Sequence, residues 1–302
     1  MALWFNNIRR LSTWMLLLLY TVNCQASDNT PVSPDDLAKQ SLRFIVLAPH
    51  IVESMYEIGA GQQIIGTTEH ADFPKDAEAI PRIGNYARLQ VERILQLRPD
   101  AVIAWQTGNP MEDLARLEKY NIKVVYSHPT KLEDVATEIR MLGELTGRST
   151  AAERIASRYL VRLNEIKTQY QNAAPISVFY ELWSRPLRTV AGQAWPQQQV
   201  ALCGGNNPFV NATEDYPQVS LEKVIAYKPQ VIIQPSPHSG ESPDGIDWQQ
   251  WHEIPAVKHK QILHPNSDKV HRMTTRMLDE ITLLCEQIAA ARTLYTAQNE
   301  AK

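Results

Sequence analysis

The stretch "YARLQVERILQLRPDAVI" (residues 86–103) recurs as "YPQVSLEKVIAYKPQVII" (residues 216–233) in this chain of 302 residues. Both copies contain a Tyr, a Glu, a basic residue before Pro and an apolar tail, and the matching residues, such as Glu92 and Glu222, are 130 positions apart. Each copy predicts a short helix that a proline ends, followed by a buried strand. A unit of this kind at matching places in both halves predicts two similar lobes.

Further apolar runs alternate with helical patterns on both sides of the two copies. Buried parallel strands are predicted for "RFIVLA", "QQIIGTT", "AVIAW" and "IKVVYS" in the first half and for "ISVFYEL", "VIIQP" and "KQILHP" in the second. Helical spacing lies between them, as in "MEDLARLEKYN", and in the final "TRMLDEITLLCEQIAAARTLY". Because short links join strands and helices in alternation, we predict an α/β fold with two Rossmann-like lobes and parallel sheets.

One long helical pattern separates the two halves. The segment "STAAERIASRYLVRLNEIKTQYQ" begins with a capping-box pair, Thr150 and Glu153, and then repeats apolar residues at helical spacing. A helix of this length spans roughly 33 Å at 1.5 Å per residue, about the width of a small domain. We therefore predict a connecting helix within 149–173, between an N-terminal lobe of 42–148 and a C-terminal lobe of 174–302.

The N-terminus has the layout of a secretory signal. Arg9 and Arg10 precede an apolar stretch at 14–22, and small residues follow, up to Ala26. We predict a cleaved signal peptide at 1–26, a flexible segment at 27–41 and export to the periplasm. An uncleaved membrane anchor and a lipid-modified Cys24 are the alternatives.

Removal of the signal peptide would leave two cysteines, Cys203 and Cys285. In an oxidising compartment, an even pair of cysteines indicates one disulfide. Two separately buried thiols are the alternative, because Cys often behaves as a small hydrophobic residue.

The composition argues against nucleic acid as a partner. Thirty basic and thirty-three acidic residues give a net charge of −3, which creates no field that would attract a polyanion.

Motifs of enzymes are also missing from the sequence. It contains no G-x-S-x-G, no H-E-x-x-H and no Walker loop, so we predict no catalytic residues and no enzyme activity. The alternative is a metal-ion binder or metal-dependent enzyme, since His50, His70 and His128 follow predicted strands and three imidazoles could hold a metal. The other histidines are expected at the surface: His238, His252, His259, His264 and His271.

Aromatic residues gather where a ligand is expected. In open parallel sheets, ligands bind beyond the carboxyl ends of the strands. The residues at or near those ends include Tyr86, Trp105, Trp183 and Tyr216. An aromatic wall on both sides of a cleft favours a large, flat ligand.

Several of these segments resemble one family of binding proteins. "IVLAPHIVESMYEIGAG", "DFP", "VERILQLRPDAVIAW" and "LCGGNNPF" are similar to the periplasmic cobalamin-binding proteins of ABC importers, within the siderophore-and-cobalamin class. The resemblance begins near Arg43 and extends to the last helix. It implies a class III periplasmic binding protein with a rigid connecting helix, which acts as a monomer without a cofactor and carries a corrinoid ligand. A ferric siderophore or haem is the alternative ligand.

The resemblance also implies roles for single residues. It places Tyr86, Trp105 and Tyr216 against the ligand, with Trp183 and Arg272 in the same cleft. His70 replaces an aromatic residue of the family, which allows an imidazole near the cobalt. No protein residue is expected to hold a resident metal.

Two further expectations come from the resemblance. Cys203 and Cys285 match the positions of a family disulfide. Glu92 and Glu222 match the acidic residues by which such proteins contact arginines on the two halves of a permease dimer, so the repeat would supply one Glu for each half.

Overall fold

Two parallel four-stranded sheets organise the part of the chain that the computed structural model describes, residues 34–237 and 244–300. These residues belong to one compact unit that begins at Ser33. The predicted signal peptide (1–26) and His238 lie outside the described residues. Within the described part, no helix combines the length and the apolar character that a bilayer span requires.

The first sheet has the strand order β2-β1-β3-β4, and each neighbouring pair is parallel. Its strands are β1 (Phe44–Val46), β2 (Ile64–Thr67), β3 (Ala101–Trp105) and β4 (Val124–Ser127). The helices of this lobe are α2 (Pro49–Glu57), α3 (Val91–Leu97), α4 (Met111–Lys119) and α5 (Asp134–Thr146), with the short 3-10 helices η1 (Gly61–Gln63) and η2 (Lys75–Ala79). Phe44 and Val46 face one apolar cluster and Ile45 faces another, so both sides of the sheet are covered.

The second sheet has the order β10-β9-β5-β8 and is also parallel. Its strands are β5 (Ile176–Tyr180), β8 (Gly205–Asn206), β9 (Val231–Ile233) and β10 (Ile262–Leu263), and a separate antiparallel pair is formed by β6 (Trp183–Ser184) and β7 (Leu187–Arg188). The helices are α7 (Trp195–Leu202), α8 (Leu221–Tyr227), η3 (Trp248–Gln250), α9 (Pro255–Lys258), α10 (Ser267–Val270) and α11 (Met277–Glu300). The predicted α/β fold with two lobes of parallel strands is confirmed.

The sequence repeat corresponds to a structural repeat. The helices α3 and α8 have seven residues each, and both end in a left-handed residue, Arg98 in the first copy and Lys228 in the second. Each is followed by a proline and then by a strand, β3 or β9, that lies inside its sheet. The two copies therefore place a matching glutamate in the first turn of a matching helix.

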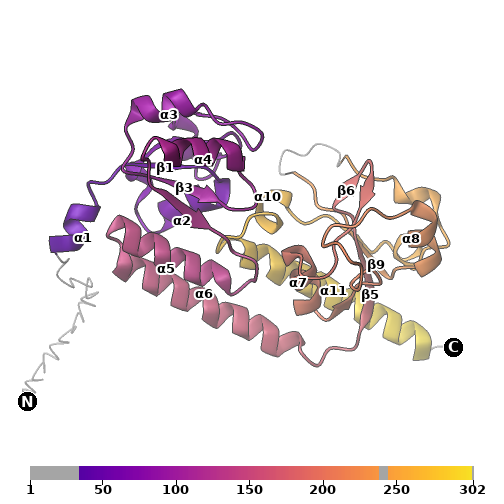
Figure 1. Cartoon of the computed structure of the whole chain (residues 1–302). Helices are drawn as coiled ribbons and strands as arrows, with labels where there is room; N and C mark the ends of the chain where they lie inside the picture. The colour runs from indigo at the N-terminus through magenta and orange to yellow at the C-terminus, as the bar shows by residue number, and fades with distance from the viewer. Residues whose placement is uncertain (1–33, 238–243, 301–302) are drawn as a thin grey trace, which may run out of the picture. The chain divides into compact units, whose positions relative to one another are not determined.

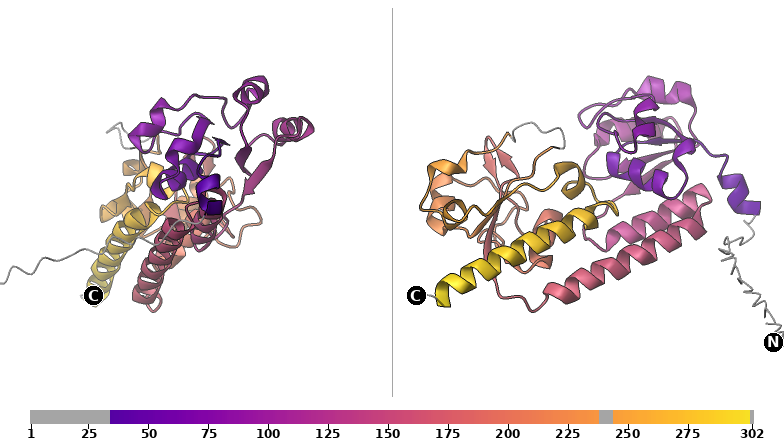
Figure 2. Two further views of the ribbon diagram at one scale, coloured as in Figure 1. Left: turned by 90° about the vertical axis from the view of Figure 1, so that its left-hand side faces the viewer. Right: turned by 180° about the vertical axis from the view of Figure 1, so that it is seen from behind.

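The lobes share their largest apolar cluster. The connecting helix predicted within 149–173 is α6 (Ser149–Tyr170), which packs along α5 and contacts α11 (Figures 1 and 2). Buried residues of α6 such as Tyr159 join one cluster with Val46 of the first sheet, Val178 of the second sheet and Ile281 of α11. The core is thus continuous from one sheet to the other.

The start of the described chain differs from the prediction. The segment 27–41 was expected to be flexible, but its described part contains α1 (Pro34–Lys39). The Gln40 side chain donates to the carbonyl of Gly147 at 3.0 Å, and the Gln63 side chain donates to the carbonyl of Lys39 at 2.8 Å. These contacts with distant residues attach the short helix to the first lobe.

The predicted disulfide is confirmed. Cys203, directly after α7, is bonded to Cys285 in α11, and both residues are fully buried. The bond ties the first part of the second lobe to the last helix of the chain.

Candidate functional site

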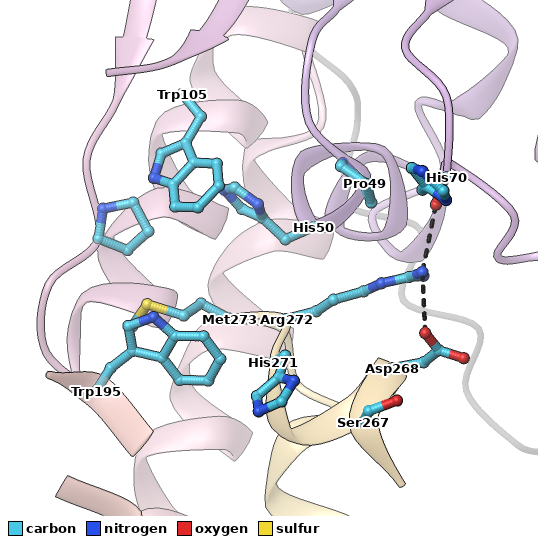
Figure 3. Close-up of a pocket in the computed structure, with 11 residues that line it drawn as sticks. Pro49, His50, His70, Trp105, Trp195, Ser267, Asp268, His271, Arg272 and Met273 are labelled. Carbon is cyan, nitrogen blue, oxygen red and sulfur yellow. Dashed lines mark hydrogen bonds and ion pairs between the residues drawn. The ribbon is translucent and has the colours of Figure 1, made fainter. Parts of the chain in front are cut away.

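A cavity of about 250 Å³ lies where residues of both lobes meet (Figure 3). The first lobe contributes residues that follow its parallel strands, as expected for an open α/β sheet. These residues are Pro49, His50, His70, Trp105 and Pro129. The second lobe contributes Trp195, Ser267, Asp268, His271, Arg272 and Met273.

Trp105 is fixed at the end of β3. Its backbone N–H donates to the Asn109 side chain at 2.7 Å, and that amide in turn donates to the Leu47 carbonyl at 2.8 Å. The indole lies over Gly108, where any side chain would overlap the ring. Asn109 and Gly108 therefore hold the ring in the cavity wall, where the sequence predicted it.

His50 and Glu138 form a buried pair next to Trp105. The His50 ring meets the indole edge-on, with 5.3 Å between ring centroids, and its Nε2 lies 3.6 Å from Oε1 of Glu138. Burial lowers the pKa of His50 to about 4 and raises the pKa of Glu138 to about 8, although Ser127 donates a hydrogen bond to that carboxyl. Both side chains are thus uncharged at neutral pH.

This pair makes stability depend on pH. From pH 4.5 to about 8 the folded protein keeps a proton on Glu138 that the unfolded chain releases, so this group lowers the free energy of unfolding as pH rises. Below pH 6.5 the unfolded chain protonates His50 and the folded protein does not, so this group raises the free energy of unfolding as pH rises toward 6.5. From pH 6.5 to 8 we expect the stability of the natural protein to fall by about 2 kcal/mol relative to Glu138→Gln.

Urea unfolding of both proteins at pH 6.5 and pH 8 measures this difference. Glutamine keeps the acceptor for Ser127 and has no titrating proton, so the comparison isolates the proton on Glu138. Parallel pH profiles of the two proteins would mean that Glu138 is ionised in the folded state.

Of the second-lobe residues that line the cavity, the sequence identified only Arg272; two of the others carry rings. Trp195, the first residue of α7, faces the cavity, and His271 lies 6.2 Å from its ring centroid in an edge-on contact. The prediction that His271 is a surface residue was wrong: it is half-buried, and its Nε2 lies 3.0 Å from the Tyr180 hydroxyl. Burial lowers the pKa of His271 to about 4. The signals in the sequence were weak: a Trp before a Pro, and a His beside an Arg that was expected in the cleft.

Arg272 lines the cavity, but acidic groups surround its guanidinium. Nη1 donates to Glu53 at 2.8 Å and to Asp72 at 2.7 Å, and Nη2 donates to the His70 carbonyl at 3.2 Å. Asp268 lies 3.4 Å from Nη2. Burial lowers the pKa of Arg272, but the hydrogen bonds that its guanidinium donates to Asp72 and Glu53 outweigh this effect and raise the pKa. The charge of Arg272 is thus already neutralised within the protein.

His70 lines the same cavity in an unusual backbone conformation. Its φ of 65° is in the left-handed region, which a residue other than glycine adopts at some cost. The hydrogen bond from Arg272 to its carbonyl fixes this turn at the end of β2.

A second cavity of about 490 Å³ shares part of its wall with the first. Both cavities are lined by Ser267 and His271, and the second also includes Trp183, which is 62% exposed. Tyr86 and Tyr216 line neither cavity. The structure therefore brings together Trp105, His70 and Arg272, and places Trp183 beside them.

The two repeated tyrosines are exposed near the starts of α3 and α8. Tyr86 is 77% exposed at the tip of a tight loop, and Tyr216 is 38% exposed. In the loop of Tyr86, Gly84 has a φ of 139° and lies so close to Arg88 that no side chain would fit. Both rings thus have accessible apolar surface. Their contact with a ligand stays a prediction.

The three histidines of the metal hypothesis do not converge. His50 and His70 line the first cavity, whereas His128 is exposed and lines a different pocket. Within residues 34–237 and 244–300, no group of three His, Cys, Asp or Glu side chains could hold a metal ion.

The two repeated glutamates are exposed, but their surroundings differ. Oε1 of Glu92 accepts a hydrogen bond from Arg116 of α4 at 3.0 Å. Glu222 follows the cap residue Ser220, and hydrogen bonds from its own backbone and from Ser220 lower the pKa of its carboxyl. Both side chains are exposed at the surface.

Comparisons with known proteins agree with this geometry. A family model described as "Periplasmic binding protein" matches residues 45–268. A vitamin B12-binding protein of Vibrio campbellii (strain ATCC BAA-1116) is 38% identical over 251 residues, 83% of this chain and 90% of that protein. Another of Vibrio vulnificus (strain YJ016) is 36% identical over 276 residues, 91% of this chain and 96% of that protein.

Solved structures show the same fold. The periplasmic vitamin B12 binding protein of Vibrio cholerae matches with a TM-score of 0.76 at 34% identity, over 83% of this chain and 97% of that one. A periplasmic haem-binding protein from Roseiflexus sp. RS-1 matches with a TM-score of 0.72 at 22% identity, over 83% and 99%. With the family model covering most of the chain, these similarities lead to one conclusion: the chain belongs to the periplasmic binding protein family.

Proposed function

We propose that this protein captures cobalamin between its two lobes in the periplasm and delivers it to the permease of an ABC importer. The observation that carries the proposal is the pair of Trp rings, Trp105 and Trp195, which face one cavity from different lobes. Relatives named vitamin B12-binding proteins, at 34–38% identity over most of the chain, support this ligand. The same proposal holds that the protein is exported, that it is a monomer and that it catalyses no reaction.

The electrostatics of the cavity favour a corrinoid over haem or a siderophore. Its cation, Arg272, is held by Glu53 and Asp72, and its imidazoles His50 and His271 are uncharged at neutral pH. Haem carries two propionates, which would need a free positive charge. A corrin ring carries amide groups, which can donate to Asp268 and can donate to or accept from Ser267, so they need no free positive charge.

Calorimetric titration of the purified protein with cyanocobalamin, cobinamide, haemin, a ferric siderophore and zinc tests the ligand. We expect one cyanocobalamin to bind per chain and to remain bound through desalting. Retention of haemin or the siderophore, with no uptake of cyanocobalamin, would assign the protein to the other ligand class.

Trp105→Ala should weaken cobalamin binding by about 1–3 kcal/mol, roughly 5- to 150-fold in Kd, because an aromatic anchor in a cavity contributes more than its neighbours. Tyr120→Ala is the matched control, since Tyr120 is 59% exposed and lines neither cavity. Equal affinities for the two variants, by the same titration, would place the ligand elsewhere.

Delivery would use Glu92 and Glu222. Each is a surface carboxylate in the first turn of a repeated helix, so two similar lobes can present equivalent charges to a permease dimer.

A further inference from the structure

A second group of contacts joins the lobes beside the cavity. The first lobe supplies carboxylates from α2 and from the loop after β2, namely Glu53, Glu57 and Asp72. The second lobe supplies their partners, Arg272, Thr275 and Arg276, from the six residues between α10 and α11. More than 190 residues separate the partners in sequence, so these bonds exist only when the lobes meet.

Glu53 is the centre of this group. Its side chain is only 3% exposed, and it pairs with two arginines at once: Oε1 lies 2.8 Å from Arg272 and Oε2 lies 3.0 Å from Arg276. Burial raises the pKa of Glu53, and the charges of both arginines oppose that rise. A buried carboxylate without them would be a costly charge inside the protein.

The two arginines are fixed by the first lobe on more than one side. Arg272 also binds Asp72 and the His70 carbonyl. The guanidinium of Arg276 stacks on the Phe73 ring, 3.4 Å from its centroid. We call Glu53, Asp72, Arg272 and Arg276 the inter-lobe clasp.

The opposite side of the cavity is closed by a weaker, uncharged junction. There the Gln198 amide of α7 donates to the Thr130 carbonyl at 2.8 Å and accepts from the Leu132 N–H at 3.2 Å. The cavity lies between this junction and the clasp, because its lining includes Trp195 on one side and His70 and Arg272 on the other (Figure 3).

We infer that the inter-lobe clasp holds the two lobes together without any ligand and sets the width of the cleft. The chain itself supplies every group of the clasp, so closure does not wait for a bound molecule. The buried position of Glu53 and Arg272 protects the clasp from screening by salt. This inference is independent of which ligand the cleft takes.

The test is the separation of the lobes in the ligand-free protein. Spin labels on cysteines placed at Lys119 and Lys258, both exposed and one in each lobe, report the distance between the lobes by pulsed electron resonance. With Glu53→Gln we expect a longer mean distance and a broader distribution, because two partly buried guanidinium groups lose their shared carboxylate.

Asp279→Asn is the matched control. It removes the ion pair of Arg162 in α6 and Asp279 in α11, which is also 2.8 Å long but is exposed. We expect the natural distance distribution in this variant. A second variant, Asp72→Asn, removes the half-exposed carboxylate of the clasp. We expect its mean distance between the labels to lie between those of the natural protein and Glu53→Gln. It also provides the test if Glu53→Gln does not fold. Natural distance distributions in the folded Glu53 and Asp72 variants, or in the Asp72 variant alone, would overturn the inference.

Discussion

Replacement of both Glu92 and Glu222 by Lys is expected to abolish cobalamin uptake in cells while leaving the fold and the ligand affinity nearly unchanged. The two carboxylates are exposed and lie outside both cavities, so their loss costs little stability. Lysines at these positions would instead repel arginines on a permease dimer. Uptake of labelled cobalamin by cells that carry the variant, with titration of the purified protein, measures both effects.

The ion pair of Glu92 with Arg116 does not block this role. Exposed pairs of this kind contribute only about 0–1 kcal/mol, so a partner's arginine can replace Arg116. The double change Glu112→Lys with Glu253→Lys is the control, because it alters the net charge equally at two other exposed positions. Normal uptake by the Glu92 and Glu222 variant, or an equal defect in the control, would exclude a specific docking role.

Loss of the disulfide should produce the largest change in stability. The double variant Cys203→Ala with Cys285→Ala opens a loop whose ends are 82 residues apart in sequence. In the chain-entropy model a loop of this length contributes about 4 to 5 kcal/mol to the free energy of unfolding. Urea unfolding of the oxidised natural protein and of the variant measures the difference.

A reducing agent supplies the control for this experiment. It should lower the stability of the natural protein toward that of the double variant and leave the variant itself unchanged. Recovery of both thiols in free form by peptide mapping of the exported protein would contradict the prediction.

Most of the fold could be predicted because its strands are apolar and its helices are periodic. The repeat identified α3 with β3 and α8 with β9, and spacing identified α6. The helix α5 was not predicted, although it has 13 residues. Its buried face includes Glu138, which interrupts the apolar pattern, and Glu133 provides no side-chain cap at its start.

The site was predicted well in the first lobe and less well in the second. Trp105 is the last residue of a five-residue strand, so the rule that ligands bind beyond strand ends could locate it. The second lobe has two-residue strands before α7 and α10, and such short strands have no alternation that a sequence reader can recognise. Trp195 and His271 therefore gave only weak signals. The pairing of Arg272 with Glu53 and Asp72 depends on how the lobes meet, which local patterns do not encode.

The shared core has a consequence for the order of folding. Met277, Ile281, Leu284 and Ile288 of α11 belong to the same apolar cluster as Val46 of the first sheet. In chain order they follow the strands of both sheets, so they are synthesised after them. The shared apolar cluster stays incomplete until α11 has been synthesised. We therefore expect the two lobes to reach their native packing together, in one cooperative step late in synthesis.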